Sequence, residues 1–388
     1  MKAGWEVKAL GDVIDLISGQ HIDAKDYNTE GQGIGYLTGP SDFGSICPTV
    51  SKWTEFPKKN AKSGDVLLTV KGSGVGKVNL LDIPEVAISR QIMAVRAKTI
   101  DPRFLFLLLQ SFQNYFNGRA SGAAIPGISR TDVTGLRLPL PPLEEQKRIV
   151  EVLDAAFEGL TRARAHTETN LQNARELFES GLLEVFGGLN DPDDQKLLSD
   201  VSLQFGRGKS KHRPRNDKAL YGGTYPFIQT GDVRNSRHII ESYSQTYNDV
   251  GLAQSKLWPS GTVCITIAAN IAETGVLGFD ACFPDSIIGM VPNATKTSST
   301  YVEYLLQFFQ KRIKALGEGS AQQNINLATF ETEYFPFPPL HVQDDAVERL
   351  SYLRSTVQDL ETHYRAKLAD LDDIRQALLQ KAFAGELT

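Results

Sequence analysis

The side chains of this chain that are best suited to chemistry are basic and amide groups, and they gather in two segments. A dense basic run in the second half contains Arg207, Lys209, Lys211, His212, Arg213, Arg215 and Lys218. Gly206, Gly208 and Pro214 interrupt this run, so we expect a loop that contacts phosphates. A looser cluster in the first half contains Lys58, Lys59, Lys62, Lys71 and Lys77, and an ordinary solvated surface is the alternative interpretation there.

Side chains that can read base edges lie on predicted loops near both clusters. They are Ser89, Arg90 and Gln91 in the first half and Gln229, Thr230, Arg234, Asn235 and Arg237 in the second. In the major groove Arg can read guanine, and Asn or Gln can read adenine. For each single residue, the alternative is an ordinary hydrated loop side chain.

The segment from Lys71 to Val78 is similar to a nucleotide-binding loop but lacks two required residues. Lys71 stands where the first glycine of that loop is needed, and Val78 stands where Ser or Thr must follow the lysine. We therefore interpret the segment as a glycine turn in which Lys71, Ser73 and Lys77 contact DNA phosphates.

We find no catalytic, metal or cofactor site in the sequence. The acidic segment 192–196 is contiguous and reads as a linker, and the six histidines lack metal-ligand spacing. Three widely spaced cysteines predict reduced thiols and a cytoplasmic protein, and no apolar run predicts a membrane segment or a signal sequence.

The elements that must position these residues occur twice. A shift of 197 residues places Leu140-Pro141-Pro142-Leu143 on Phe337-Pro338-Pro339-Leu340, and Gln146 on Gln343. We expect four parts: a first recognition domain (1–142), a central helical spacer (143–188), a second recognition domain (189–339) and a C-terminal helical spacer (340–388). The net charges of 1–142 and 195–339 are +3 and +2, whereas those of 143–194 and 340–388 are −7 and −3.

Each globular part is predicted to be β-rich. The expected elements are short helices at 8–13 and 196–201, strands at 34–38, 63–70, 226–230 and 260–267, and one longer helix at 103–115 or 301–315. Each Pro-Pro corner then starts a helix, over 143–186 and 340–383. At about 1.5 Å per residue, each of these helices spans roughly 65 Å.

An apolar seam with alternating steps of four and three follows both long helices. Such spacing is typical of a coiled coil, and the simplest arrangement is an antiparallel pair with one globular part at either end. The fold class is therefore α+β, with an internal pseudo-twofold repeat. The predicted seam contains Leu153, Leu160, Leu171, Leu177, Leu350, Val357, Leu360, Leu371 and Ile374.

Together these features resemble the specificity subunit of type I restriction-modification systems. The resemblance covers essentially the whole chain: two globular parts, the Leu-Pro-Leu-Pro-Pro-Leu-Glu-Glu-Gln entry at 138–146, its repeat at 335–343, and the C-terminal segment 378–387. The second entry departs from the family pattern, because His341-Val342 replaces the Glu pair before Gln343.

The resemblance implies that each globular part reads one half of a split double-stranded DNA target and that the helices set the gap. At about 3.4 Å per base pair, the helix length bounds the separation of the two parts at roughly 19 base pairs. It also implies two methyltransferase subunits as partners, which bring S-adenosylmethionine, and it leaves open restriction subunits with ATP-driven translocation. The alternatives are a two-headed coiled-coil adaptor for protein partners and a specificity subunit of a methylation-only system.

Overall fold

The computed structural model describes residues 4–120, 127–212, 214–268, 271–318 and 325–387. The chain divides into two compact units, Met1–Glu168 with Ala366–Thr388, and Thr169–Arg365. Each unit contains one β-rich body and one end of each of two long helices, α5 (Leu143–Phe186) and α10 (Leu340–Ala384). These two helices confirm the spans predicted from the sequence to within one residue.

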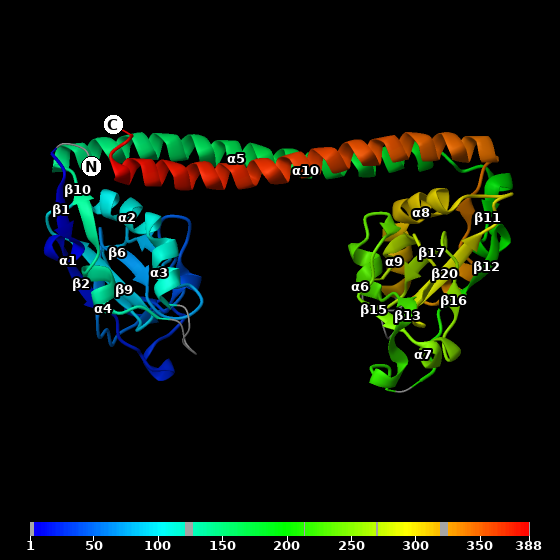
Figure 1. Ribbon diagram of the computed structural model, residues 1–388, viewed down its shortest axis with the longest axis horizontal. Coiled ribbons are helices and arrows are strands. Elements are labelled where there is room, and N and C mark those ends of the chain that lie inside the picture. The colour runs from blue at the N-terminus through cyan, green and yellow to red at the C-terminus, as the bar shows by residue number, and fades with distance from the viewer. Residues whose placement is uncertain (1–3, 121–126, 213, 269–270, 319–324, 388) are drawn as a thin grey trace. The chain divides into compact units, whose positions relative to one another are not determined.

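The first body pairs its strands into two four-stranded sheets and one two-stranded sheet (Figure 1). Its elements are β1 (Glu6–Ala9), α1 (Leu10–Val13), β2 (Ile14–Ser18), β3 (Ile34–Leu37), β4 (Trp53–Thr54), β5 (Asn60–Lys62), β6 (Val66–Thr69), β7 (Val78–Leu80), β8 (Glu85–Ile88), β9 (Ile92–Ala97), α2 (Pro102–Ser111), α3 (Gln113–Ala120), α4 (Arg130–Thr134) and β10 (Arg137–Leu140). The strand orders are β2-β9-β6-β7, β4-β3-β8-β5 and β1-β10.

The second body repeats this plan. Its elements are β11 (Gln195–Lys196), β12 (Ser202–Arg207), β13 (Tyr221–Phe227), α6 (Thr230–Asn235), β14 (Ile239–Ile240), β15 (Gln245–Tyr247), α7 (Asp249–Ala253), β16 (Leu257–Trp258), β17 (Val263–Thr266), β18 (Thr274–Leu277), β19 (Ala281–Cys282), β20 (Ile287–Pro292), α8 (Ser299–Phe308), α9 (Gln310–Glu318) and β21 (Phe335–Pro336). The strand orders are β12-β20-β17-β18-β14, β15-β13-β19-β16 and β11-β21. Single 3₁₀ turns lie at Ala24–Asp26, Pro40–Asp42, Pro192–Asp194, Leu198–Val201, Lys218–Leu220 and Leu327–Glu331.

Several local predictions differ from the structure. The predicted strand at 226–230 ends at Phe227, and Thr230, Arg234 and Asn235, which were expected on a loop, lie in α6. The predicted short helices at 8–13 and 196–201 begin only at Leu10 and Leu198, because the residues before them pair as strands with β10 and β21. The longer helix of each body is broken in two, since Phe112 and Phe309 leave the helical region with ψ of 7° and 5°.

A buried central strand and a capped helix form the core of each body. Every side chain of β6 and β17 is buried, as expected for strands covered on both faces. The helices α2 and α8 are capped at their N-termini by Asp101 and Ser298, whose side chains accept the backbone N–H of Phe104 and Tyr301. Each helix packs between its own sheet and the long helices of its unit (Figure 1).

The repeated glutamine after each Pro-Pro corner is a buried hydrogen-bonding side chain. Gln146 is 3% exposed, donates to the Pro141 carbonyl at 2.9 Å and accepts the Asp101 N–H at 2.9 Å. Gln343 is 2% exposed and donates to the Pro338 carbonyl at 2.7 Å and the Lys296 carbonyl at 2.9 Å. Each glutamine therefore fixes the start of a long helix to its own body.

Within each unit the two long helices pack antiparallel. In the first unit Arg375 lies over the Phe157 ring at 4.0 Å, and Arg164 pairs with Asp372 at 2.8 Å. The residue numbers rise along α5 while they fall along α10, which defines the antiparallel direction.

The second unit contains contacts at the matching positions, with the residue types exchanged between those positions. Arg354 of α10 lies 4.5 Å over the Phe178 ring of α5, and Arg175 of α5 pairs with Glu361 of α10 at 2.8 Å. The 197-residue shift places Phe157 on Arg354 and Phe178 on Arg375. The aromatic ring is therefore on α5 in both units, and the arginine above it is on α10 in both.

The predicted seam residues differ in burial. Leu153, Leu350 and Val357 are buried, and Leu160, Leu171, Leu360 and Leu371 are half-buried, whereas Leu177 and Ile374 are 45% and 47% exposed. A strict seven-residue spacing drifts around a helix of 3.6 residues per turn. The packed face has moved by one position at these two places, to Phe178 and Arg375.

Candidate nucleic-acid interface

The two bodies hold an equivalent turn against the end of an edge strand. In the first body the N–H groups of Gly19 and Gln20 donate to the carbonyls of Ile92 and Ile88, at 3.0 and 2.9 Å. In the second body those of Gly208 and Lys209 donate to Ile287 and Phe283, at 2.8 and 3.0 Å. The turn of residues 89–91 therefore matches the turn of residues 284–286.

Only glycine fits beside these turns. A Cβ on Gly19 would lie 2.1 Å from the Ser89 carbonyl oxygen, and a Cβ on Gly208 would lie 2.3 Å from the Pro284 carbonyl oxygen. Gly19 was not predicted as part of this interface, and Gly208 was predicted only as an interruption of the basic run. They hold the turns close to the strands β2 and β12, and so present the turn side chains outward.

In the first body, three of the predicted DNA-contacting residues line one cavity. Lys71, Arg90 and Gln91 surround a cavity of about 460 Å³ together with Gly72 and Gly127. The Arg90 guanidinium is exposed and has no hydrogen bond or ion pair with any part of the chain that the structure describes. The Gln91 N–H is held by the Ser89 hydroxyl at 3.1 Å, which in turn donates to the Thr38 carbonyl at 2.6 Å.

The other two first-body candidates lie elsewhere on the glycine turn. Ser73 is exposed, and Lys77 lines a separate cavity of about 300 Å³ with Gln110 and Arg375, next to the long helices. The structure therefore brings Lys71 and Arg90 together but separates Lys77 from them.

In the second body, three candidates line a cavity of about 720 Å³. Arg215, Gln229 and Thr230 share this cavity with Gln245 and Ser286. Arg215 forms an ion pair with Asp285 at 2.6 Å, and the Tyr221 hydroxyl donates to the Arg215 carbonyl at 2.7 Å. The loop that carries Arg215 is thereby fastened to the turn that matches Arg90 and Gln91.

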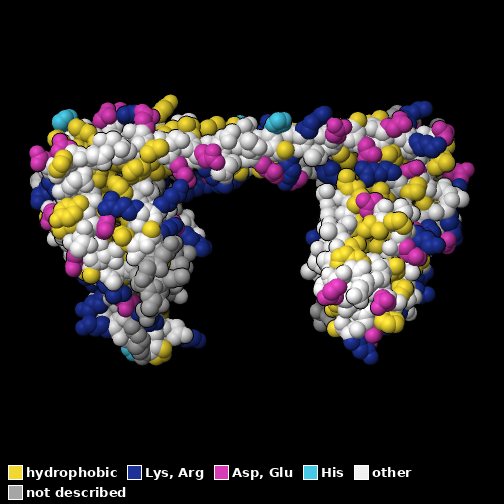
Figure 2. Space-filling model, turned by 180° about the vertical axis from the view of Figure 1, so that it is seen from behind, with side chains coloured by type: hydrophobic (Ala, Val, Ile, Leu, Met, Phe, Trp, Pro, Cys, Tyr) yellow, Lys and Arg dark blue, Asp and Glu magenta, His cyan; other side chains and the backbone are white. Residues whose placement is uncertain are grey.

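The remaining residues of the basic run lie on the same body. His212 pairs with Asp217 at 2.9 Å, and hydrogen bonds from the Ala219 N–H and from His212 lower the pKa of Asp217. Lys211 is exposed, and Lys and Arg side chains gather at the lower end of this body in Figure 2. Arg213 lies outside the described residues.

Two residues of this surface were not predicted from the sequence. Lys256 lies 4.0 Å over the Trp258 ring, and burial and the nearby Lys209 lower its pKa. Gln245 hydrogen-bonds with Gln229 in the cavity. Neither stands in a basic run or a motif, so only the pairing of distant strands could have identified them.

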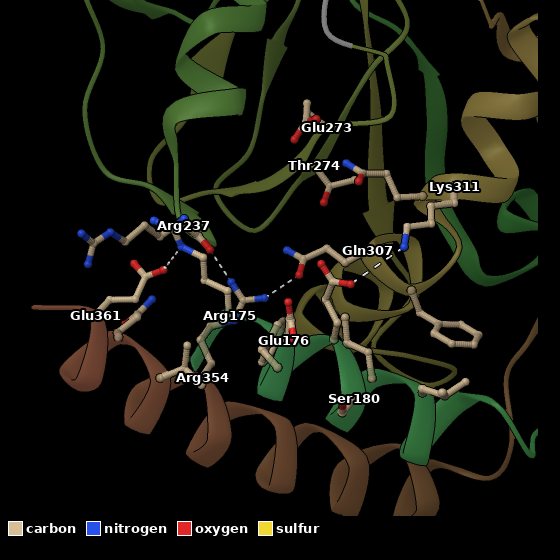
Figure 3. Close-up of a pocket in the computed structure, with 18 of the residues that line it drawn as sticks. Arg175, Glu176, Ser180, Arg237, Glu273, Thr274, Gln307, Lys311, Arg354 and Glu361 are labelled. Atoms are coloured by element: carbon tan, nitrogen blue, oxygen red, sulfur yellow. Dashed lines mark hydrogen bonds and ion pairs between the residues drawn. The ribbon is translucent and has the colours of Figure 1, made fainter. Parts of the chain in front are cut away.

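Arg234 and Arg237 lie away from the Gln229 cavity. They line a cavity of about 820 Å³ between α8 and the long helices of the second unit, with Arg175, Lys311 and Glu361 (Figure 3). The Arg237 carbonyl accepts a hydrogen bond from Arg354. This position makes them neighbours of the long helices rather than of the other base-reading candidates.

A buried carboxylate fastens this part of the second unit. Glu303 is fully buried and pairs with His238 at 2.8 Å and with Arg354 at 3.7 Å, while the Thr274 hydroxyl donates to it at 3.3 Å. Since these partners come from the sheet and α10, the network joins body and helix.

Among the described residues, no three His, Cys, Asp or Glu side chains are grouped as they would be to hold a metal ion. Within the same residues, no helix combines the length and the apolar character that a membrane crossing requires.

Comparison with known proteins identifies one family. The model of the type I restriction modification DNA specificity domain matches residues 2–170 and again residues 198–369. The MjaVIII specificity subunit of Methanocaldococcus jannaschii is 24% identical, with 91% of this chain and 87% of that protein covered. The EcoDI specificity subunit of Escherichia coli is 22% identical, with 99% and 89% covered. A putative specificity subunit, MjaX of Methanocaldococcus jannaschii, is 30% identical over 183 residues, which cover 46% of this chain and 42% of that protein.

Solved structures show the same fold. A chain from a study of complex assembly and conformational transition of the type I R-M system superposes with a TM-score of 0.81 at 23% identity, covering 100% of this chain and 99% of that one. The HsdS subunit from Thermoanaerobacter tengcongensis superposes with a TM-score of 0.60 at 21% identity, covering 100% and 98%.

Proposed function

Because this chain belongs to the family of type I restriction-modification DNA specificity domains, we propose that it recognises a bipartite double-stranded DNA sequence and directs methyltransferase subunits to it. In this proposal residues 1–142 and 189–339 each read one half of the target. The helical parts, 143–188 and 340–388, set the gap between the halves.

One observation carries the proposal: each body places arginine and glutamine side chains around a cavity beside the same turn. Lys71, Arg90 and Gln91 line the cavity of the first body, and Arg215 and Gln229 line that of the second. Basic groups suit phosphates, and arginine and glutamine suit base edges, so each cavity holds both kinds of group that a half-site reader needs.

The chemistry is assigned to other subunits. We propose that this chain is non-catalytic and binds no cofactor itself, and that two methyltransferase subunits bring S-adenosylmethionine to it. Restriction subunits complete the assembly in systems that cleave DNA. The cytoplasm is the proposed compartment, since it holds host DNA and keeps thiols such as Cys264 and Cys282 reduced.

The salt dependence of binding tests the proposal. Purified chain is titrated with a duplex library at several salt concentrations, and Lys209→Ala/Lys211→Ala is compared with Lys311→Ala/Lys314→Ala, which removes the same charge from α9. Loss of two phosphate contacts lowers the slope of log K against log salt by roughly 2. We expect this decrease in the first variant. The second variant should keep the wild-type slope if Arg234 and Arg237, which share a cavity with Lys311, do not contact phosphates. Binding that does not respond to salt would favour a two-headed protein adaptor instead.

A further inference from the structure

Gln229 stands at a rigid position of the second body, between β13 and α6. Its backbone N–H donates to the Asp232 carboxylate at 2.8 Å, and its carbonyl accepts the Asp232 N–H at 3.0 Å. The adjoining Phe227 ring stacks on Tyr247 with the ring centroids 4.1 Å apart, and both rings are buried. A side chain attached here is therefore aimed from a fixed base.

The Gln229 side chain is itself oriented by a second amide. Its Nε2 donates to Oε1 of Gln245 at 2.9 Å. Gln245 is the first residue of β15, where it pairs with Phe227 of β13, so the ladder that builds the sheet also sets the distance between the two amides. Both side chains are exposed and line the cavity of about 720 Å³.

This hydrogen bond leaves the two amides with different free groups. Gln245 Oε1 already accepts a bond, so Gln245 presents mainly donors. Gln229 uses one N–H and keeps its second N–H and its Oε1, and the structure shows no other bond from these atoms to a described residue. Gln229 thus presents a free donor beside an acceptor that carries no bond, whereas the Gln245 oxygen keeps only its second lone pair.

A donor beside an acceptor matches one base edge in the major groove. Adenine presents the N6 amino donor beside the N7 acceptor, whereas guanine presents two acceptors and cytosine a donor alone. We propose that Gln229 reads an adenine in the half-site bound by the second body, with Gln245 as the positioning residue. This assignment rests on the proposed function.

The first body lacks this device at the matching position. Ala87 of β8 pairs with Tyr36, and Cys282 of β19 pairs with Phe227, which places Thr38 where the second body has Gln229. The Thr38 hydroxyl donates to Asp42 at 2.9 Å and is occupied. The pair of amides is therefore a feature of the second body and is not repeated at the matching position of the first.

Selection from a duplex library with randomised bases tests the assignment in the full-length chain. The wild-type chain is expected to enrich a split motif in which one position prefers adenine by roughly 10- to 100-fold. In Gln229→Glu the preference at that position should move to cytosine, whose N4 amino group donates to a carboxylate. All other positions should stay the same.

Two variants of the second amide test its positioning role. Gln245→Ala should weaken the preference at the same position, because Gln229 loses its orienting partner. Gln245→Glu should keep adenine, since a carboxylate oxygen still accepts the Gln229 N–H. Gln358→Glu on α10 is the charge control, because it adds the same negative charge away from this cavity. Arg90→Ala should relax the base preference in the half-site bound by the first body, and so identifies that half-site.

The possible outcomes distinguish failure of the adenine assignment from failure of the proposed function. Gln229→Glu that binds with an unchanged motif overturns the adenine assignment and leaves the proposed function intact. A Gln245→Ala motif identical to wild type overturns the positioning role. A wild-type chain that enriches no motif overturns the proposed function itself.

Discussion

The two bodies share a backbone plan and place charge on different parts of it. In the first body the exposed turn carries Arg90 and Gln91, and the glycine turn carries Lys71 and Lys77. The matching turn of the second body carries Asp285, which Arg215 neutralises at 2.6 Å from a different loop. Repetition has preserved where side chains are presented, but not which side chains, so two copies of one fold can serve two unlike half-sites.

The buried polar groups differ in the same way. Asp65 and Arg96 of the first body form an ion pair, and the matching residues of the second body are Thr262 and Val291. Conversely, the 197-residue shift matches the buried Glu303 with Phe106, also buried. These exchanges indicate that each network stabilises its own body rather than the shared fold.

The Asp65 ion pair should give the largest effect. Asp65 is 2% exposed, and its two oxygens accept Nε and Nη2 of Arg96, each at 2.8 Å. We expect Asp65→Ala to cost about 2–3 kcal/mol of unfolding free energy, less than a fully enclosed pair, because the Arg96 side chain is 37% exposed and can still reach water. Urea unfolding of a Trp258→Phe background would report the first body through Trp5 and Trp53.

The second body supplies the control for this experiment. Asp65→Thr/Arg96→Val copies its residues and leaves no unpaired charge, so it should recover most of the lost stability. If this double variant is as unstable as Asp65→Ala, the ion pair is required by the first body and the comparison between the bodies fails at this site.

A left-handed backbone position should give the next largest effect. Gly76 has φ of 84°, and its N–H donates to the Thr69 carbonyl; Ala272 has φ of 60°, and its N–H donates to the matching Thr266 carbonyl. Gly76→Ala should cost about 1–2 kcal/mol, because it adds backbone strain and places a Cβ 3.0 Å from the Gln113 carbonyl oxygen.

The opposite substitution, alanine to glycine at position 272 of the second body, should change stability very little. In Ala272→Gly the relief of strain is offset by the lost burial of a methyl group and by the freer unfolded chain, so we expect a change within about 0.5 kcal/mol. Thermal unfolding of both variants would check this asymmetry. Equal and opposite effects would show that backbone strain alone decides both positions.

The ion pairs between the long helices should give the smallest effect. Arg164 and Asp372 are 42% and 63% exposed, so Arg164→Glu should cost only about 0.5 kcal/mol, and added salt should reduce that cost. Arg164→Glu/Asp372→Arg should restore stability if the two side chains interact directly. A cost that remains in the double variant would assign the effect to helix packing instead.

Much of the fold could be predicted because local sequence patterns determine it and these patterns occur twice. The Pro-Pro corners with Gln146 and Gln343 located both long helices, since proline and an uninterrupted polar-apolar pattern are local features. The breaks at Phe112 and Phe309 could not be predicted, because phenylalanine is neither a helix breaker nor a typical capping residue and so does not mark a helix end in the sequence.

The candidate interface was predictable where exposed polar residues cluster along the sequence. Lys71, Arg90 and Gln91 line one cavity in the first body. Arg215 and Gln229 line a different cavity in the second body. Gln245 and Lys256 escaped because strand pairing, not sequence proximity, brings them to the surface. The assignment of the cavity-lining residues to DNA contacts stays a prediction. The same holds for Arg234 and Arg237 beside the long helices.

The exchanged contacts between the long helices make the two halves of the chain complementary. α5 contributes Phe157, Arg164, Arg175 and Phe178, and α10 contributes the arginines and acids that meet them. A chain built from two copies of its own first half would set Arg164 against Arg175, and one built from two second halves would set Glu361 against Asp372. New target combinations are therefore best assembled by grafting bodies at the Pro-Pro corners, with the native helices retained as a matched set.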